Sequence, residues 1–253
     1  KGQSKYAPPK LDVAGMDATA KRKATYQKFA KTYLRTVAGI DENIGRLLKW
    51  LDDTGQADNT VIIYTADQGY FLGEHNMFDK RFMYEESLRM PFVIRYPKEI
   101  PSRTVLNDII INVDFAELML DYAGADVPDS MQGRSFRANL AGKTPADWRD
   151  AMYYHYWSHS APRPAHYGIR THEAKLIWFY GMVGGGRNPD DCWEFYDLKT
   201  DPNEYENRYK DPKYADTIAA LKKRLAALRQ EFKDTADPTK SSGGKKRKKR
   251  TKA

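Results

Sequence analysis

The sequence predicts an α/β fold that continues into a small antiparallel sheet packed with a helix. Apolar residues recur every three or four positions from about residue 18 to 52, and a short β-branched run follows at 59–65. Aromatic-rich short runs separated by turn signals then fill residues 151–198. A helix followed by a buried strand is typical of an α/β layer, whereas closely spaced short strands are typical of an antiparallel sheet.

The first elements are a linker, a long helix and a strand. Residues 1–17 contain two prolines and no hydrophobic period, so we expect a linker there. The helix is predicted from a single apolar face, which comprises Tyr26, Phe29, Tyr33, Val37, Ile40, Ile44, Leu47 and Leu51. Gly55 marks its end, and the run 59–65 has the composition of a strand buried on both faces.

The later elements follow in the same way. A second strand is predicted at 91–97, between two prolines, and a short helix at 114–122, capped by Asn112 or Asp114. The antiparallel strands are expected at 151–157, 166–171, 174–180 and 193–198. Helical spacing returns at 218–232, so a helix is expected to pack on that sheet. We place a domain boundary near residue 145.

Composition indicates a globular chain without a membrane span. Of the 253 residues, 41% are hydrophobic and 13% aromatic, which argues against disorder. No apolar run approaches the roughly 18 to 20 residues that a membrane helix needs. Cys192 is the single cysteine, so no intrachain disulfide can form and the redox compartment stays open. The chain begins without an initiator methionine or a signal peptide, and we therefore expect it to be part of a longer gene product.

The formal charge of +8 is concentrated at the C-terminus. Residues 239–253 contain Ser-Ser-Gly-Gly followed by seven Lys and Arg residues, which leaves the rest of the chain close to neutral. We expect this basic tail to be disordered and solvated, and we do not expect nucleic acid to be the partner. The alternative function of such a tail is electrostatic binding of a polyanion.

One segment carries the residues best suited to chemistry. It runs from Thr65 to His75, continues through Asp79 and Lys80 to Pro91, and begins where a buried strand is predicted to end. Ligands of open α/β sheets collect beyond the carboxyl ends of the strands. Asp67 and Gln68 offer adjacent hard oxygens of the kind Ca²⁺ binds, but Ca²⁺ takes about six to eight ligands. Other segments or substrate oxygens must complete the shell.

This segment resembles the second metal motif of the type I sulfatase family, which belongs to the alkaline phosphatase superfamily. The lead-in Ile40–Leu48 is similar to the family as well. Segments 151–155, 166–177 and 193–207 resemble its small C-terminal subdomain, so the resemblance covers about residues 25–235. It implies that residues 18–145 are the C-terminal part of the catalytic domain, with part of an alkaline-phosphatase-like central sheet and flanking helices. Residues 146–238 would be the antiparallel-sheet subdomain.

The resemblance assigns roles residue by residue. Asp67 matches a metal-binding aspartate, and Gln68 stands where Asn or His is commoner in the family; Ca²⁺ is the implied cofactor. Lys80 matches the lysine that contacts the sulfate, where an ammonium offsets charge developing on the ester oxygen. His75 would donate to the substrate or orient a neighbour, with packing against Glu74 as the structural alternative.

Three residues of the C-terminal sheet are the predicted substrate-binding group. In the family this sheet borders the substrate pocket, and His155, His166 and Arg170 are the candidates for reading the sugar or other ester group. For the two histidines, ordinary packing in an aromatic sheet is the alternative. Arg89 is expected to pair with Glu85 or Glu86 and hold the loop.

The nucleophile is missing from the sequence. Sulfatases resembling this chain use a formylglycine made from the Cys or Ser of a Cys/Ser-x-Pro/Ala-x-Arg signature. Cys192 lacks that context, and Glu99–Arg103 has glutamate in place of the nucleophile. The first pair of metal aspartates has no candidate among residues 1–24. We therefore expect the isolated chain to be inactive.

Three functions follow as hypotheses. The first is hydrolysis of a sulfate ester, with a sulfated carbohydrate as the partner. The second keeps the superfamily but makes the protein a phosphodiesterase or phosphonate monoester hydrolase, because the metal half-site is shared. The third is a non-catalytic module that binds a polyanion. The sequence leaves the linkage, the oligomeric state and the compartment open, although the resemblance favours export.

Overall fold

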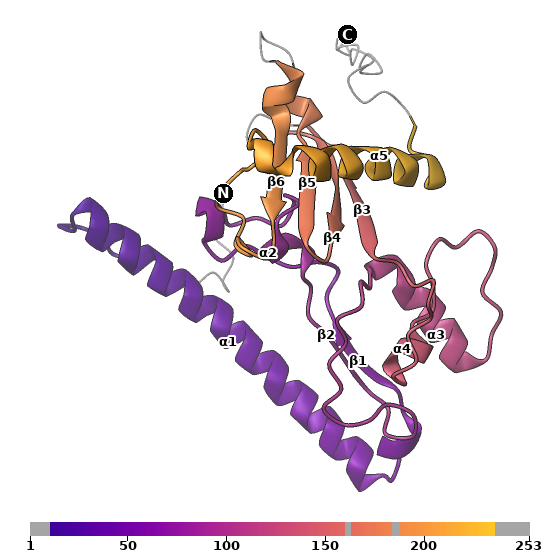
Figure 1. Ribbon diagram of the computed structural model, residues 1–253. Coiled ribbons are helices and arrows are strands. Elements are labelled where there is room, and N and C mark those ends of the chain that lie inside the picture. Colours follow the sequence, from indigo (N-terminus) through magenta and orange to yellow (C-terminus); the bar gives the residue numbers. More distant parts are fainter. Residues whose placement is uncertain (1–10, 160–162, 184–187, 236–253) are drawn as a thin grey trace, which may run out of the picture.

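The computed structural model describes residues 11–159, 163–183 and 188–235 (Figure 1). The predicted linker is described from residue 11 onward, and the predicted basic tail lies outside the described residues. Helix α1 (Ala18–Asp53) begins at Asp17, whose carboxylate accepts hydrogen bonds from the Thr19 and Ala20 N–H groups at 2.8 Å each. The prediction of one long helix is confirmed.

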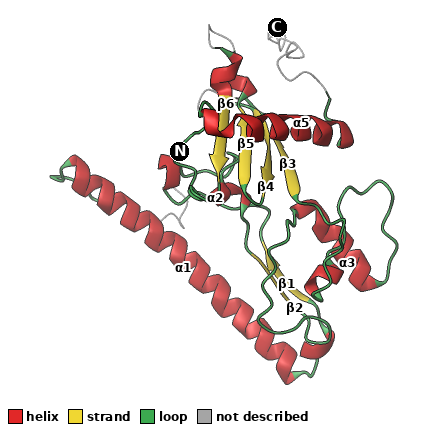
Figure 2. Ribbon diagram, in the orientation of Figure 1, coloured by secondary structure: helices red, strands yellow, loops and turns green. Residues whose placement is uncertain are grey.

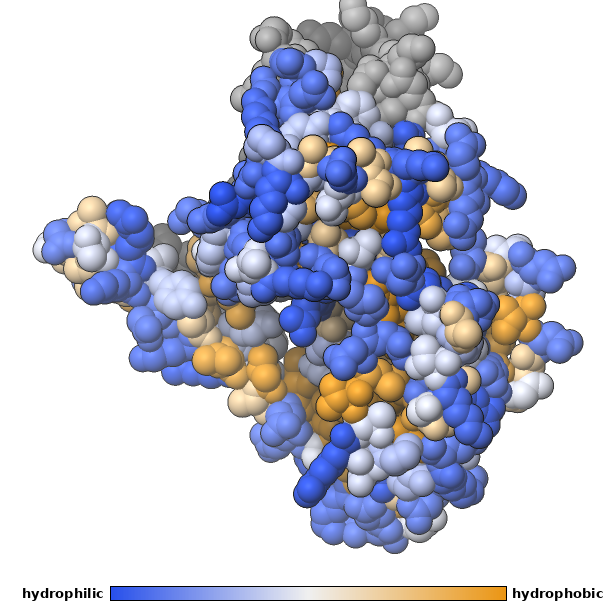
Figure 3. All heavy atoms as spheres, in the orientation of Figure 1, coloured by the Kyte–Doolittle hydropathy of each residue, from blue (hydrophilic) through white to orange (hydrophobic). Residues whose placement is uncertain are grey.

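The apolar face of α1 is largely exposed in the described part of the chain. Leu51 is the one buried residue of α1, and Figure 1 shows the helix running alongside the body rather than into it. Figure 3 shows apolar side chains at the surface between α1 and the body. The exposed large apolar residues of α1 are Tyr26, Tyr33, Leu34, Val37, Ile40, Leu47 and Trp50. Most helices in proteins are stabilised by packing such a face, so we expect this one to have a covering partner.

Strands β1 (Ile62–Thr65) and β2 (Phe92–Arg95) form an antiparallel pair in which Ile63 lies opposite Ile94. One face of the pair packs against a core of Leu118, Phe136 and Leu140. The opposite face carries Tyr64 and Val93, which are 39% and 63% exposed. The expected strand is present, but the prediction that it is buried on both faces is wrong, because within the described residues only one face of the pair is covered.

Three short helices occur in the same part of the chain. They are α2 (Glu85–Leu88), α3 (Phe115–Ala123) and α4 (Arg137–Leu140). Helix α3 ends at Gly124, whose left-handed φ of 67° suits a residue without Cβ. Six 3₁₀ turns are present in the described residues: Ala57–Asn59, Glu74–Asn76, Asn112–Asp114, Tyr180–Met182, Pro189–Cys192 and Pro212–Tyr214.

The C-terminal part is a four-stranded antiparallel sheet, as predicted (Figure 2). Its strands lie in sequence order: β3 (Ala151–Tyr156), β4 (His166–Thr171), β5 (Ala174–Trp178) and β6 (Trp193–Asp197). Helix α5 (Ala215–Glu231) crosses the sheet and buries Ile218, Leu221 and Leu225 in the same core as sheet residues such as Leu176. The predicted helix-on-sheet packing is confirmed.

The other face of this sheet is covered by the segment 71–84. Phe71, Phe82 and Met83 share a core with Ile177, the neighbour of Leu176 on β5. Adjacent strand residues point to opposite faces, so α5 and the segment 71–84 sandwich the sheet. The segment that contains Lys80 therefore rests on the C-terminal sheet, and its packing crosses the boundary predicted near residue 145, which stays a prediction. No helix among the described residues is long and apolar enough to cross a membrane.

Candidate functional site

Asp67 and Lys80 converge just beyond the end of β1. The Lys80 Nζ lies 3.5 Å from the Asp67 Oδ2, although twelve residues separate the two in the chain. Both side chains are open to solvent, at 79% exposure for Asp67 and 44% for Lys80. The carboxylate and the ammonium are thus available to an incoming ligand, and the structure brings together two of the residues that the sequence singled out.

Gln68 joins the two loops that carry this pair. Its Nε2 donates a hydrogen bond to the Lys80 carbonyl, which leaves the Gln68 Oε1 for another partner. The Lys80 N–H in turn donates to the Asp79 Oδ1 at 2.6 Å. The Lys80 backbone is held on both sides, so its side chain projects from a fixed base.

Gly69 sets how closely the Asp67 loop approaches α2. Its N–H donates to the Ser87 carbonyl at 2.8 Å, and a Cβ at this position would lie 2.0 Å from the Glu86 carbonyl oxygen. That distance is far shorter than a van der Waals contact with a backbone atom. The Asp67 loop can therefore approach α2 this closely only if residue 69 is glycine.

Replacing Gly69 by alanine is expected to lower the free energy of unfolding by about 1–3 kcal/mol, because the backbone must move to remove the clash. Urea denaturation of the 253-residue chain measures this. Gly45→Ala is the matched control: it lies in α1 with nothing within 4 Å of the added Cβ, and it should stabilise by about 0.5–1 kcal/mol. A Gly69→Ala variant as stable as the wild type would contradict the close approach.

The residues present fit part of a cation shell. Asp67 and Gln68 can offer two oxygens, and no group of three or more His, Cys, Asp or Glu residues in the described ranges is arranged to hold a metal ion. A divalent cation bound here would need further oxygens from outside the described residues or from a ligand.

His75 contacts Tyr84 and Glu86. Its ring stacks on Tyr84 at a centroid distance of 4.6 Å, and its Nε2 lies 3.6 Å from the Glu86 Oε2. Glu74, the packing partner expected from the sequence, instead accepts a hydrogen bond from the Leu72 N–H at 2.6 Å. A catalytic role for His75 stays a prediction.

Two arginines flank the Lys80 backbone at Asp79. Arg81 Nη1 lies 2.9 Å from both Asp79 oxygens, and Arg163 Nη1 lies 3.2 Å from Oδ2. Burial opposes the charged form of Asp79, but the Lys80 N–H and the two guanidinium groups outweigh it and hold its pKa below the usual value. Sequence reasoning missed Arg163, because it comes from the segment after β3 and nothing near it in the sequence signals the contact.

His155 is enclosed by its neighbours. Its Nδ1 lies 2.5 Å from the Asp234 Oδ2 and its Nε2 lies 2.9 Å from the Tyr180 hydroxyl, with the side chain 2% exposed. Burial lowers the pKa of His155, and the Asp234 carboxylate offsets part of that effect. Both ring nitrogens are engaged, so His155 has no free nitrogen for a ligand in this arrangement. Trp157, whose ring stacks on His155 at a centroid distance of 4.2 Å, is exposed to solvent.

His166 and Arg170 also contact protein groups. His166 is buried against Phe82 and Phe179, and burial lowers its pKa to about 4, so the ring is neutral at pH 7. This placement matches the packing alternative. Arg170 forms hydrogen bonds to both Glu85 oxygens, at 3.2 and 3.1 Å. Substrate binding by either residue stays a prediction.

A buried ion cluster connects the C-terminal sheet to α2. Lys175, fully buried on β5, places its Nζ 2.9 Å from the Glu85 Oε1 and 2.5 Å from the Glu204 Oε1. Glu204 also accepts a hydrogen bond from the Glu85 N–H at 2.7 Å. Because Glu85 begins α2 and Ser87 of α2 binds Gly69, the cluster supports the loop that carries Asp67. The signal in the sequence was a lysine inside an apolar strand, which requires a charged partner.

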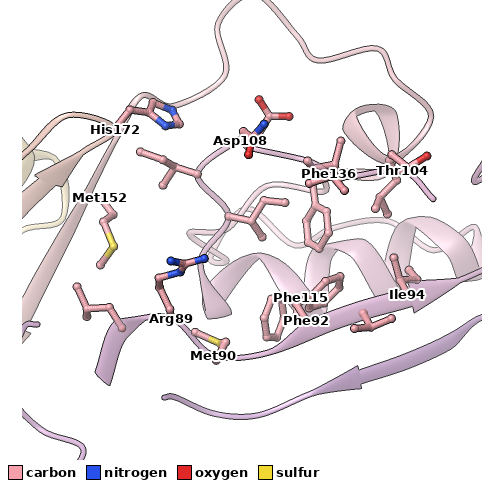
Figure 4. Close-up of a pocket in the computed structure, with 18 of the residues that line it drawn as sticks. Arg89, Met90, Phe92, Ile94, Thr104, Asp108, Phe115, Phe136, Met152 and His172 are labelled. Atoms are coloured by element: carbon pink, nitrogen blue, oxygen red, sulfur yellow. The ribbon is translucent and has the colours of Figure 1, made fainter. Parts of the chain in front are cut away.

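Glu85 therefore pairs with Arg170 and Lys175, not with Arg89. The expectation that Arg89 pairs with Glu85 or Glu86 is wrong within the described residues, where no ion pair is formed by Arg89. Arg89 instead lines a cavity of about 770 Å³ between β2, the segment 104–110 and the start of the C-terminal sheet (Figure 4). Most of the residues that line it are of apolar types. Arg170 lines it too, but Asp67, Gln68 and Lys80 do not.

Two family models match the chain. The model described as N-sulphoglucosamine sulphohydrolase, C-terminal, matches residues 73–231, and the model described as Sulfatase matches residues 5–125. Together they cover the Asp67–Lys80 site and the C-terminal sheet.

Similar proteins are also described as sulfatases. An N-acetylglucosamine-6-O-sulfatase of Bacteroides thetaiotaomicron is 50% identical over 217 residues, covering 84% of this chain and 38% of that protein. An extracellular sulfatase SULF-1 homolog of Drosophila melanogaster is 38% identical over 123 residues, covering 47% of this chain and 11% of that protein. The chain thus spans well under half the length of these relatives.

Solved structures share the fold. A protein solved in complex with its substrate D-glucosamine-2-N,6-O-disulfate superposes with a TM-score of 0.81 at 45% identity, covering 90% of this chain and 45% of that one. A phosphonate monoester hydrolase from Silicibacter pomeroyi superposes with a TM-score of 0.72 at 25% identity, covering 91% of this chain and 45% of that one.

Proposed function

The chain belongs to the sulfatase family, and from this we propose that it forms the C-terminal part of an enzyme that hydrolyses sulfate esters on sugars. The observation that carries the proposal is the convergence of Asp67 and Lys80 at 3.5 Å beyond the end of β1. A carboxylate that can hold a cation and an ammonium that can hold an anionic ester lie side by side, and such preorganised charges can stabilise the charge that develops as a sulfate ester is cleaved.

The chain's own residues supply positioning and charge. Asp67 and Gln68 would hold a divalent cation, Ca²⁺ in our proposal, which when bound supplies Lewis-acid polarisation of sulfate oxygens. Lys80 binds the sulfate group and offsets the charge that develops on the ester oxygen as the S–O bond breaks. The hydrogen bonds from Gln68 and to Asp79 keep the Lys80 backbone in place. The attacking oxygen would come from a nucleophile outside these 253 residues.

The substrate class follows from the relatives. The Bacteroides relative is named an N-acetylglucosamine-6-O-sulfatase, and the similar solved structure contains its substrate D-glucosamine-2-N,6-O-disulfate, so both sugars carry a 6-sulfate. We therefore propose a 6-sulfated glucosamine unit as the substrate. Export also belongs to the proposal, because relatives include an extracellular sulfatase.

Phosphonate monoester hydrolysis is the second candidate, favoured by the match to the Silicibacter pomeroyi enzyme over 91% of this chain. The metal half-site is expected to be common to both functions, so the reaction itself must distinguish them. Parallel assays with a sulfate ester and a phosphonate monoester of the same leaving group do so.

A hybrid enzyme tests the proposal. The chain is fused behind the N-terminal segment of the Bacteroides relative and produced in a host that converts the nucleophile to formylglycine. We expect the hybrid to release sulfate from N-acetylglucosamine 6-sulfate, measured by ion chromatography, and the isolated chain to release none. Turnover by the isolated chain would refute the view that the nucleophile lies outside it. A hybrid that cleaves the phosphonate and not the sulfate ester would favour the second candidate.

A further inference from the structure

Arg163 is the second arginine that contacts the Asp79 carboxylate beside Lys80. Arg81 already pairs with both oxygens of the Asp79 carboxylate, since its Nη1 lies 2.9 Å from each of them. Arg163 adds a second guanidinium to the same carboxylate at 3.2 Å. A single Asp79 charge does not require two arginines, so the second cation is in excess.

The free donors of Arg163 and Arg81 have no protein acceptor in the described residues. Each guanidinium has five N–H donors, and the hydrogen bonds to Asp79 use only the Nη1 of each. The Arg163 Nε is buried and lacks a hydrogen-bond partner there. A buried donor without an acceptor costs about 1–3 kcal/mol, so the described residues leave the Arg163 guanidinium incompletely satisfied.

The local charge balance also favours an anion. Lys80, Arg81 and Arg163 face two carboxylates, Asp67 and Asp79. If a cation binds Asp67, as in the proposed function, Lys80 is released from its ion pair and only Asp79 opposes three positive side chains. Arg81 and Arg163 remain 42% and 35% exposed, so a ligand can reach them.

We propose that Arg163, supported by Arg81, forms a second anion subsite beside Lys80, which binds a charged group of the substrate other than the ester that is cleaved. It rests on the proposed function and deepens it: the preferred substrate carries a second sulfate or a carboxylate on the same sugar or its neighbour. Planar guanidinium groups match both anions through paired N–H donors, which a lysine cannot do.

Binding of two sugars to the 253-residue chain tests the subsite. D-Glucosamine 6-sulfate and D-glucosamine 2-N,6-O-disulfate are titrated by NMR or calorimetry at fixed ionic strength. We expect the disulfate to bind about tenfold more tightly, the difference expected for one charge-assisted contact. Arg163→Gln should remove that difference by weakening the disulfate about tenfold, with a much smaller effect on the monosulfate, whereas Arg163→Lys should restore only part of the difference. Arg35→Gln, with the same charge change on α1, is the control and should retain the wild-type difference.

Three results would overturn the subsite: equal affinities for both sugars in the wild type, an Arg163→Gln variant that weakens both equally, or no saturable binding of the disulfate. Thermal melting of each variant confirms folding, and Arg163→Lys keeps the comparison valid if Arg163→Gln unfolds. The proposed function fails separately, since it depends on sulfate release by the hybrid. A hybrid that releases sulfate from the monosulfate and the disulfate with the same kcat/KM would contradict the subsite and leave the proposed function intact.

Discussion

Lys175→Met is expected to lower the free energy of unfolding by about 3–5 kcal/mol, the cost of leaving a buried charge without its partner. Lys175 is fully buried and is shared by Glu85 and Glu204, at 2.9 and 2.5 Å. Arg170 still pairs with Glu85 after the change, but no other cation of the described residues is paired with Glu204. Urea denaturation of the chain at several pH values provides the measurement.

The deficit of Lys175→Met should depend on pH. Burial raises the pKa of Glu204 to about 7, against an unfolded value of about 4.3. Its folded-state pKa is the higher one, so its contribution is fully present below about pH 4 and is lost as the pH rises through 7. At pH 5 Glu204 is protonated with or without Lys175, whereas at pH 8 the variant must either ionise Glu204 without its cation or keep it protonated, and both cost free energy. We therefore expect a larger deficit at pH 8 than at pH 5.

Lys199→Met is the matched control for that result. Lys199 forms a 2.6 Å pair with Glu173, but both side chains are more than 60% exposed. An exposed pair contributes about 0–1 kcal/mol, so this variant should be close to the wild type at either pH. Equal losses in the two variants would show that the buried cluster does not stabilise the fold in the way its geometry indicates.

Lys80→Ala in the hybrid enzyme is expected to lower kcat/KM for sulfate release by about 10²–10³, the range for removing a group that stabilises transition-state charge. Most of the loss should be in kcat, because the charge on the ester oxygen develops as the bond breaks. Steady-state kinetics with N-acetylglucosamine 6-sulfate measure both constants.

Lys143→Ala provides the comparison, since Lys143 is an exposed residue on the segment after α4 and outside the site. It should leave kcat/KM within about twofold of the wild-type hybrid, as expected for a surface residue. A Lys80→Ala effect below about threefold would remove Lys80 from the chemistry and leave its 3.5 Å approach to Asp67 as a surface ion pair.

The sequence was sufficient for elements whose residues repeat with a regular period. The apolar period of residues 26–51 predicted α1, and the short aromatic runs predicted the four antiparallel strands, because local spacing alone decides which face of an element is apolar. The motif around Asp67 and Lys80 was identified by its resemblance to the sulfatase family, which was possible because its residues lie within a short segment.

Contacts between distant segments could not be found in that way. Arg163 contacts Asp79, 84 positions away in the sequence, and Glu204 contacts Glu85, 119 positions away. No local sequence pattern predicts either contact. His155 and His166 looked available as strand residues, but their burial depends on which segments pack over them. The sequence by itself determined the elements and the family motif; the tertiary structure decided which side chains face a ligand, because burial and charge pairing depend on groups brought together only by folding.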